Sequence, residues 1–222
     1  MSQIEPLIIR PSDLTLKVTD LSEKVIANLM KAKDFDVIGL GDAIFLACSA
    51  VNITTDIANA HINGLSIDSF EVPVLGSINA IFIGIGRESE IDTIKRIQEE
   101  EKGMILTTER EGQVIAVRRG APIERLVTLC LIKLSKVAKL KIIAAASAIN
   151  DAVELAINMT KGPVSKEPIG VSFMDIYPIK TREDPQKKMT AISIYLKKGQ
   201  KTILDDRHRK LVKTLEAKLK GK

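Results

Sequence analysis

Two stretches of the chain share one order of apolar and small residues. In the later stretch, strand-forming Leu140, Ile142 and Ile143 lead into four residues with small side chains, Ala144–Ser147. Apolar residues then recur at helical spacing from Ile149 onward. This order predicts a buried strand, a tight turn and an amphipathic helix.

The same order occurs earlier in the chain, between Val37 and Ala60. Apolar strand residues lead there through Gly39–Gly41 into an apolar helical pattern. The pairs Ala43-Ile44 and Ala148-Ile149 occupy the same place in the two stretches, 105 residues apart. A repeat with this period indicates two copies of one domain.

The first copy is expected over residues 12–87, with the element order βαβαββ and a short hairpin at its end, because its last two strands are expected to form a tight hairpin around Gly76-Ser77. Asn63-Gly64 is expected to end the second helix, and Asp42 to cap its start. The expected strands are Leu14–Val18, Phe35–Leu40, Phe70–Leu75 and Asn79–Ile85, and the expected helices are Leu21–Lys31 and Ala43–Ala60.

The second copy is expected over residues 104–199 with the same order, a long polar hairpin tip at Lys180–Lys188 and an additional strand at Met104–Thr108. A charged connecting helix is expected over 88–103 and a basic helix over 200–222, its core at Asp205–Lys220. The expected strands are Val114–Val117, Lys139–Ala144, Val171–Ile179 and Met189–Lys197, and the expected helices are Ile123–Leu134 and Ala148–Thr160.

The composition favours a soluble, cytoplasmic protein. Hydrophobic residues make up 45% of the 222 residues, yet no apolar run reaches the length that spans a bilayer, and the first ten residues do not form a signal peptide. Cys48 and Cys130 lie in apolar helical patterns, which predicts two reduced, buried thiols. Aromatic residues are only 3%, which argues against base stacking as the main recognition device.

Charge divides the chain into two unlike halves. Residues 1–90 contain 6 Lys and Arg against 12 Asp and Glu, whereas residues 91–222 contain 27 against 16. Such asymmetry indicates that the later half meets a polyanion.

Three segments of the later half resemble the Alba family of archaeal chromatin and RNA-binding proteins. They are VIAVRRGAPIERLVTLCLIKL, KIIAAASAINDAVELAI and DIYPIKTREDPQKKMTAISIYL, which match the family's first strand and helix, its strand-to-helix junction and its hairpin arm. The earlier half matches the same order from Leu14 to Arg87. The resemblance implies a mixed α/β (α+β) fold of βαβαββ domains that pair with each other. It also implies binding to DNA or RNA with little sequence preference, and two copies in one chain imply an intrachain pseudo-dimer.

The chain departs from the family at the junction itself. The family motif there is Arg-Gly-Arg-Ala-Ile, and its arginines contact phosphates. The matching positions are Ala145 and Ser147 in the second copy and Leu40 and Asp42 in the first. The centre of the usual nucleic-acid surface is therefore largely lost.

Six cations of the second copy remain as candidates for contacts with phosphates. Arg118 and Arg119 precede a helix start, where fixed positive charge and the helix dipole favour an anion; the alternative is a solvated strand end. The hairpin tip can lie along a groove or a backbone, or it is a charged loop without a ligand. Its candidate residues are Lys180, Arg182, Lys187 and Lys188.

No catalytic residue, cofactor site or metal site is predicted. His61 and His208 have no companion at metal-ligand spacing, and Gly39-Leu40-Gly41 lacks the third glycine and the distant acid of a dinucleotide loop. We therefore expect no enzyme.

Two functions follow from the residues and the resemblance together. The first is nucleic-acid binding by the second copy, with the first copy as its pairing partner. The alternative is a protein-interaction scaffold that has lost this activity, whose partner is another Alba-like chain or an acidic protein. Self-association remains open, and no membrane partner is expected.

Overall fold

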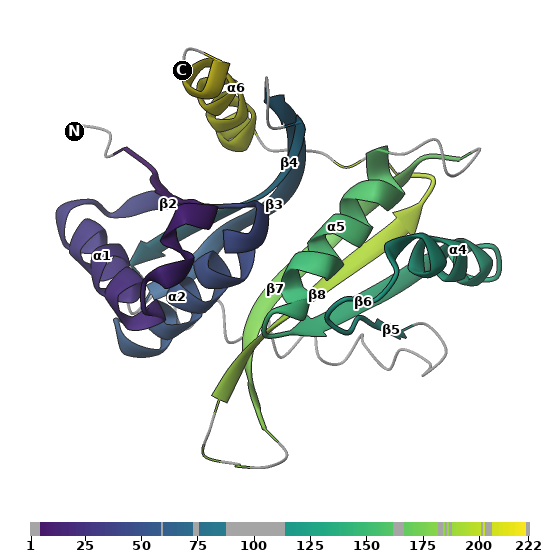
Figure 1. Ribbon diagram of the computed structural model, residues 1–222, viewed down its shortest axis with the longest axis horizontal. Helices are drawn as coiled ribbons and strands as arrows, with labels where there is room; N and C mark the ends of the chain where they lie inside the picture. The colour runs from purple at the N-terminus through teal and green to yellow at the C-terminus, as the bar shows by residue number, and fades with distance from the viewer. Residues whose placement is uncertain are drawn as a thin grey trace.

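The computed structural model describes residues 5–58, 60–72, 76–87, 114–161, 167–181, 184, 186, 188–200, 202 and 206–220. The chain is a mixed α and β protein with two separate four-stranded sheets, each of which has helices packed on it (Figure 1). Within the described residues, no helix combines the length and the apolar character that crossing a membrane requires.

The two sheets belong to two units with the same element order. The first unit consists of β1 (Leu7–Ile9), α1 (Val18–Lys31), β2 (Asp34–Leu40), α2 (Ile44–Ile57), β3 (Ala60–Val72) and β4 (Gly76–Arg87), with short 3-10 helices at Pro11–Thr15 and Gly41–Ala43. The second unit consists of β5 (Val114–Ala116), α4 (Ile123–Leu134), β6 (Lys139–Ala145), α5 (Ala148–Lys161), β7 (Ile169–Lys180) and β8 (Lys188–Lys198), and α6 (Asp206–Lys220) follows it.

The sheets also share one topology. Their strand orders are β1-β2-β4-β3 and β5-β6-β8-β7. The first pair of each sheet is parallel, and the other two pairs are antiparallel. The order βαβαββ that the sequence predicts is therefore present in both units.

Each sheet buries one face under its own two helices. In β6, Leu140, Ile142 and Ala144 are buried, whereas Lys139 is exposed and Lys141 half-buried. Successive residues of a strand point to opposite faces, so the apolar set faces α4 and α5 and the lysines face away.

The first sheet is covered on its other face as well. Leu215 of α6 is buried against β2, β3 and β4 residues such as Phe70 and Phe82, with Leu211 and Val212 beside it. The helix follows the second unit in the chain but packs on the first sheet (Figure 1). The expected basic helix is confirmed, and its apolar side covers the sheet of the other unit.

The units meet through α2 and α5. α2 is buried on nearly every side, because it packs on its own sheet and also contacts α5, β7 and β8. Asn150 of α5 accepts a hydrogen bond from the Phe45 N–H (2.8 Å) and donates one to the Asp42 carbonyl (2.9 Å). The expected cap by the Asp42 side chain is wrong, since the polar group at this helix start comes from the other unit.

Asn150 and Phe45 are separated by 105 residues, the period of the sequence repeat. Residues at a two-fold axis contact their own equivalents in the same way. The contact between α2 and α5 therefore joins equivalent positions of the sequence repeat.

Two ion pairs also join the units, with opposite polarity. Asp56 of α2 pairs with Lys188, at 2.9 Å between Oδ2 and Nζ, and Lys161 of α5 pairs with Asp68 of β3. Asp56 and Lys161 again lie one repeat period apart. One helix position thus carries an acid in the first unit and a base in the second.

The strand expected at Leu14–Val18 is wrong. Pro11 fixes a backbone angle that suits a helical turn, and the Asp13 carboxylate accepts the Arg10 N–H at 2.8 Å. The chain therefore turns at Pro11–Thr15, and the first strand lies earlier, at Leu7–Ile9.

The expected end of the second helix and the expected bounds of the strands in the first hairpin are also wrong. α2 ends at Ile57, and a β-bulge between Ile62 and Gly64 lies where the helix end was expected. β3 and β4 have 13 and 12 residues, as long as β7 and β8 with 12 and 11. The two hairpins differ in the segment that connects their strands, which is residues 73–75 in the first unit and the longer 181–187 in the second. The expected helix at 88–103 and strand at Met104–Thr108 lie outside the described residues.

Candidate nucleic-acid interface

Arg118 and Arg119 lie in a tight turn between β5 and α4. The Ala121 N–H donates to the Arg118 carbonyl at 3.1 Å, and Gly120 has φ +69°, a conformation that favours glycine. Both arginines are exposed, and neither forms an ion pair with another described residue. The Gly120 N–H donates to the Asp151 carboxylate at 2.8 Å, so the turn is fixed against the first turn of α5.

The junction between β6 and α5 has an unusual backbone conformation. Ala146 has φ +51°, its N–H donates to the Thr190 carbonyl at 2.9 Å, and its carbonyl accepts the Ile149 N–H. Gly41 has φ +53° at the equivalent place in the first unit, one repeat period earlier. The two junctions therefore follow the same path with different residues.

Lys180 and Lys188 face each other as the last pair of the β7–β8 ladder. Lys180 is exposed. Lys188 is exposed too, but its ammonium pairs with Asp56 of the first unit at 2.9 Å. Exposed pairs of this kind contribute little and are screened by salt, so Lys188 can exchange partners.

The hairpin tip is described only in part. Arg182 and Lys187, two of the predicted candidates, lie outside the described residues. Asp184 is the acidic residue at the tip that the structure describes, and its carboxylate accepts the Gln186 N–H at 2.9 Å. Its carboxylate therefore stabilises the turn.

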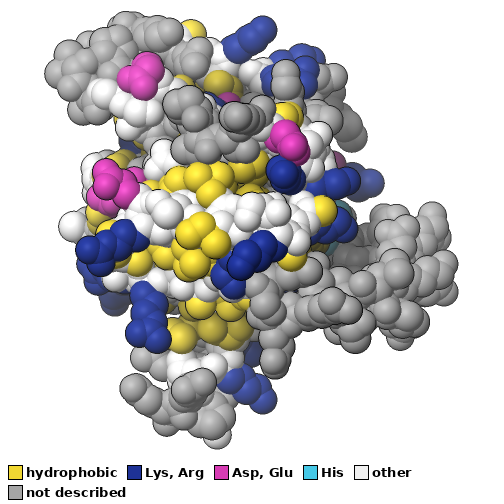
Figure 2. Space-filling model, turned by 90° about the vertical axis from the view of Figure 1, so that its right-hand side faces the viewer, with side chains coloured by type: hydrophobic (Ala, Val, Ile, Leu, Met, Phe, Trp, Pro, Cys, Tyr) yellow, Lys and Arg dark blue, Asp and Glu magenta, His cyan; other side chains and the backbone are white. Residues whose placement is uncertain are grey.

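The strand directions bring the described candidates to one end of the second sheet. β5 and β6 are parallel, so the Arg118-Arg119 turn and the junction follow the same edge. Ala145, the last residue of β6, pairs with Ala191, and Lys188 lies three residues further along the hairpin. Figure 2 looks onto the second unit and shows Lys and Arg side chains outnumbering acidic ones on this side.

Acidic side chains lie beside the centre of this end. The pKa of Glu154 is raised by partial burial first, and further by the charges of Asp151 and Asp42. Asp42 belongs to the first junction, so the carboxylates of both units gather where α2 and α5 begin. A phosphate is repelled there, and contacts with a polyanion are restricted to the flanking cations.

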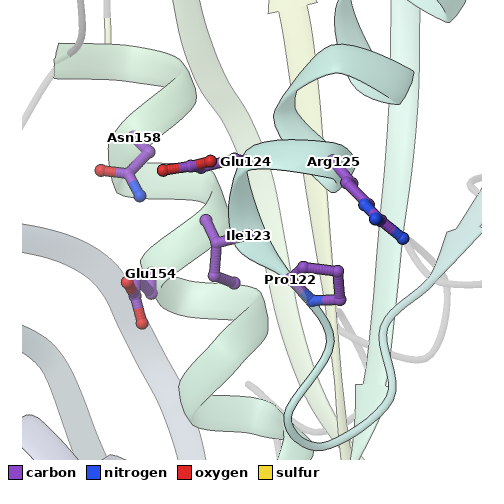
Figure 3. Close-up of a pocket in the computed structure, with 6 residues that line it drawn as sticks. All are labelled: Pro122, Ile123, Glu124, Arg125, Glu154 and Asn158. Carbon is purple, nitrogen blue, oxygen red and sulfur yellow. The ribbon is translucent and has the colours of Figure 1, made fainter.

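A pocket of about 470 Å³ lies between the start of α4 and α5 (Figure 3). Glu124 and Glu154 contribute carboxylates, whereas Arg125 points away from the other labelled side chains. Pro122, Ile123 and Asn158 complete its lining. The two carboxylates make the pocket acidic, so it would repel a phosphate group or an anionic nucleophile.

Both cysteines are free and buried, as the sequence predicts. Burial raises the pKa of each thiol to about 12. Neither is a thiolate at neutral pH, so neither is an activated nucleophile. Among the described residues, no group of His, Cys, Asp and Glu side chains could hold a metal ion.

Sequence reasoning missed the outer face of the second sheet, which faces away from α4 and α5. Phe173, Tyr195 and Lys141 meet there, with ring centroids 5.6 Å apart and the ammonium 5.0 Å from the Tyr195 ring. Alternation of lysines with apolar residues in Lys139–Lys141 was the available signal.

Comparisons with known proteins add no family assignment. No protein-family model matches the sequence, and no curated protein matches it significantly.

Proposed function

We propose that this chain is an Alba-like nucleic-acid-binding protein, with little sequence preference, whose two units form an intrachain pseudo-dimer. The second unit makes the contacts, and the first unit serves as its pairing partner. Such a role implies a cytoplasmic location near the nucleoid.

One observation carries the proposal: exposed cations that the sequence spreads over some 70 residues share one end of the second sheet. Arg118, Arg119 and Lys180 are exposed there, in the half of the chain with excess positive charge. Clustered exposed cations are what phosphate backbones require. Arg182 and Lys187 are the remaining candidates in the sequence and lie outside the described residues.

The backbone of the two junctions supports the family resemblance. The glycine of the family's Arg-Gly-Arg-Ala-Ile motif matches Gly41 and Ala146, and both of these residues have left-handed backbone. Glycine is the residue that adopts this conformation at least cost. The motif's backbone path is thus kept in both units although its arginines are absent.

A salt titration tests the proposal. With about four to six phosphate contacts, a tenfold rise in salt is expected to lower the affinity for duplex DNA or RNA by roughly four to five decades. Replacing both Arg118 and Arg119 by alanine should reduce the slope of log K against log salt by about two. The exposed Lys24→Ala variant of α1 is the matched control and should keep the slope. A flat salt response would contradict the proposal.

The alternative function is a protein-interaction scaffold, and the carboxylates of Asp42, Asp151 and Glu154 favour it. An acidic centre between the two junctions repels a phosphate backbone, which favours a protein ligand such as another Alba-like chain. A protein partner that stays bound at high salt after nuclease treatment would support this alternative.

A further inference from the structure

A basic and aromatic patch lies at one corner of the second sheet, on its outer face. Phe173 lies opposite Tyr195 in the β7–β8 ladder, and Tyr195 lies opposite Lys141 in the β6–β8 ladder. The side chain of Phe173 is 59% exposed, although large apolar side chains are normally buried. Two rings and an ammonium group therefore form one continuous surface.

Two more lysines extend this surface. Lys139 and Lys197 are directly opposite each other, two residues from Lys141 and Tyr195 along their strands, so they share the same face. Both are exposed, and neither forms an ion pair within the described part of the chain. The residues of the sheet-corner patch are thus Lys139, Lys141, Phe173, Tyr195 and Lys197.

Asp175 and Tyr177 border the sheet-corner patch on the hairpin side. The pKa of Tyr177 is raised mainly by burial, while Lys141 acts to lower it and Asp175 and Tyr195 act to raise it. Among the described residues of this face, the Asp175 carboxylate thus lies beside Lys139, Lys141 and Lys197.

The first sheet provides an internal comparison at the equivalent corner. Asp34 and Asp36 of β2 occupy the positions that correspond to Lys139 and Lys141 of β6, one repeat period later. Opposite them stand Gly86 and Gly84, where the second unit has Lys197 and Tyr195. The Asn63 amide, which hydrogen-bonds to Asp34 at 3.1 Å, fills the space over these glycines.

The sheet-corner patch is therefore not a requirement of the fold. The same topology is built in the first unit with acids and glycines at these positions. The exposed ring, the second ring beside it and the three lysines occur together at this corner and not at its counterpart, so the chemistry of the corner points to a ligand.

We propose that the sheet-corner patch binds single-stranded nucleic acid. Bases stack on the rings of Phe173 and Tyr195, and Lys139, Lys141 and Lys197 neutralise the flanking phosphates. A duplex hides the faces of its bases inside the stack, so it cannot use the two rings. An acidic protein would satisfy the lysines but not the exposed rings.

The sheet-corner patch is distinct from the cations of the proposed function, although it takes the same class of ligand. It lies at the start of β6, whereas the Arg118-Arg119 turn lies beside the end of that strand. Seven residues of extended chain separate the two sites by about 20 Å. Each can therefore be removed without the other.

The chain contains its own optical reporter for this surface. It has two tyrosines and no tryptophan. Tyr195 is in the patch, and Tyr177 lies on the same face, opposite Ala191. A base stacked on Tyr195 quenches its emission, whereas Tyr177 lies level with the end of β6, so the quenching that Tyr195→Ala removes is the part that reports on this corner.

The test is a titration of the full chain with a labelled oligothymidylate, followed by anisotropy of the label and by tyrosine emission. We expect quenching on binding, and a loss of about tenfold in affinity for Phe173→Ala and for Tyr195→Ala. Tyr195→Phe keeps the ring and should regain the affinity that Tyr195→Ala loses. Met30→Ala removes an apolar side chain that is 70% exposed in the first unit, and it serves as the control.

The outcomes separate this inference from the proposed function. If the two alanine variants bind the single strand like the parent protein, or if tyrosine emission does not change, the inference is overturned even where duplex binding persists. If replacing Arg118 and Arg119 abolishes duplex binding but leaves the quenching intact, both proposals stand. If that replacement leaves duplex binding unchanged while Phe173→Ala lowers the affinity for the single strand, the inference about the sheet-corner patch is supported. The proposed role of Arg118 and Arg119 is then contradicted.

Discussion

At the scale of single residues, Ala146 carries a backbone conformation that an L side chain disfavours. Its φ of +51° crowds Cβ against the backbone, whereas Gly41 has φ +53° at the equivalent place without that cost. An added Cβ at Gly41 would meet only Pro11 Cγ at 3.6 Å, an ordinary contact. The pair is therefore a matched test of backbone strain.

We expect Ala146→Gly to raise the free energy of unfolding by up to about 1 kcal/mol, and Gly41→Ala to lower it by about 1 kcal/mol. Urea unfolding of the two variants and the parent measures both changes. If both substitutions changed the free energy of unfolding in the same direction, side-chain packing rather than backbone conformation would dominate at these sites.

Asn150 is the polar link between the units at residue scale. Asn150→Ala removes two hydrogen bonds and leaves the Phe45 N–H without its acceptor, so we expect a loss of about 2 kcal/mol in the free energy of unfolding. Asn158→Ala, on the exposed side of the same helix, is the control and should change stability by less than about 0.5 kcal/mol. Thermal unfolding with equal losses for both variants would contradict the capping role.

The sequence could not predict the role of Asn150, because its partners lie one full repeat away. Local rules assigned the cap to Asp42, the nearest polar side chain. The tertiary contact replaced it. A glycine at position 41 is compatible with left-handed backbone, so the sequence allowed this conformation there. Alanine disfavours the same conformation, so at Ala146 only the structure reveals it.

At the scale of elements, α6 is held on the first sheet by few side chains. Leu215 is 3% exposed, and its neighbours on the sheet include Phe70 and Phe82. We expect Leu215→Ala to lower the free energy of unfolding by about 2 to 3 kcal/mol, or to release α6 alone, through the lost contacts and the cavity left behind.

Hydrogen exchange distinguishes a global loss of stability from release of the helix. Release would remove protection from α6 amides only, whereas a global effect would lower protection in β2 and β4 as well. Leu129→Ala, at a side chain 40% exposed on α4, is the control. Unchanged exchange in the Leu215 variant would refute the packing described for α6.

Helices were easier to predict than strands for a physical reason. α4 and α5 have apolar residues at helical spacing, and the observed bounds lie within one residue of the predicted ones. β3 alternates poorly, because His61, Asn63, Gly64, Ser66 and Ser69 interrupt the apolar pattern. Pairing with β4 along its whole length keeps it extended despite these residues.

At the scale of the whole molecule, buried residues of both units belong to one continuous apolar cluster. We therefore expect a single cooperative unfolding transition. The two tyrosines, both in the second unit, provide a test. Ile83→Ala, in the buried core of the first unit, should lower the urea midpoint that tyrosine fluorescence reports, since Ile→Ala costs about 2 to 5 kcal/mol. An unchanged tyrosine midpoint would show that the units unfold separately.

The candidate site was predictable in its charge but not in its arrangement. The excess of Lys and Arg in the later half can be counted from the sequence. The meeting of Phe173, Tyr195 and Lys141 depends on the registers of three strands and on a bulge in β7. No local pattern encodes such a juxtaposition.

The two inter-unit ion pairs have a consequence for how copies of the chain recognise one another. If two first units associated, Asp56 would approach the strand that bears Asp68. If two second units did so, Lys161 would approach the hairpin that bears Lys188. Each arrangement opposes like charges, and only the mixed arrangement satisfies both. Because the two units carry opposite charges at this helix position, each half of the chain matches the other half better than it matches a second copy of itself. Charge thus biases the pairing toward the two unlike halves of one chain.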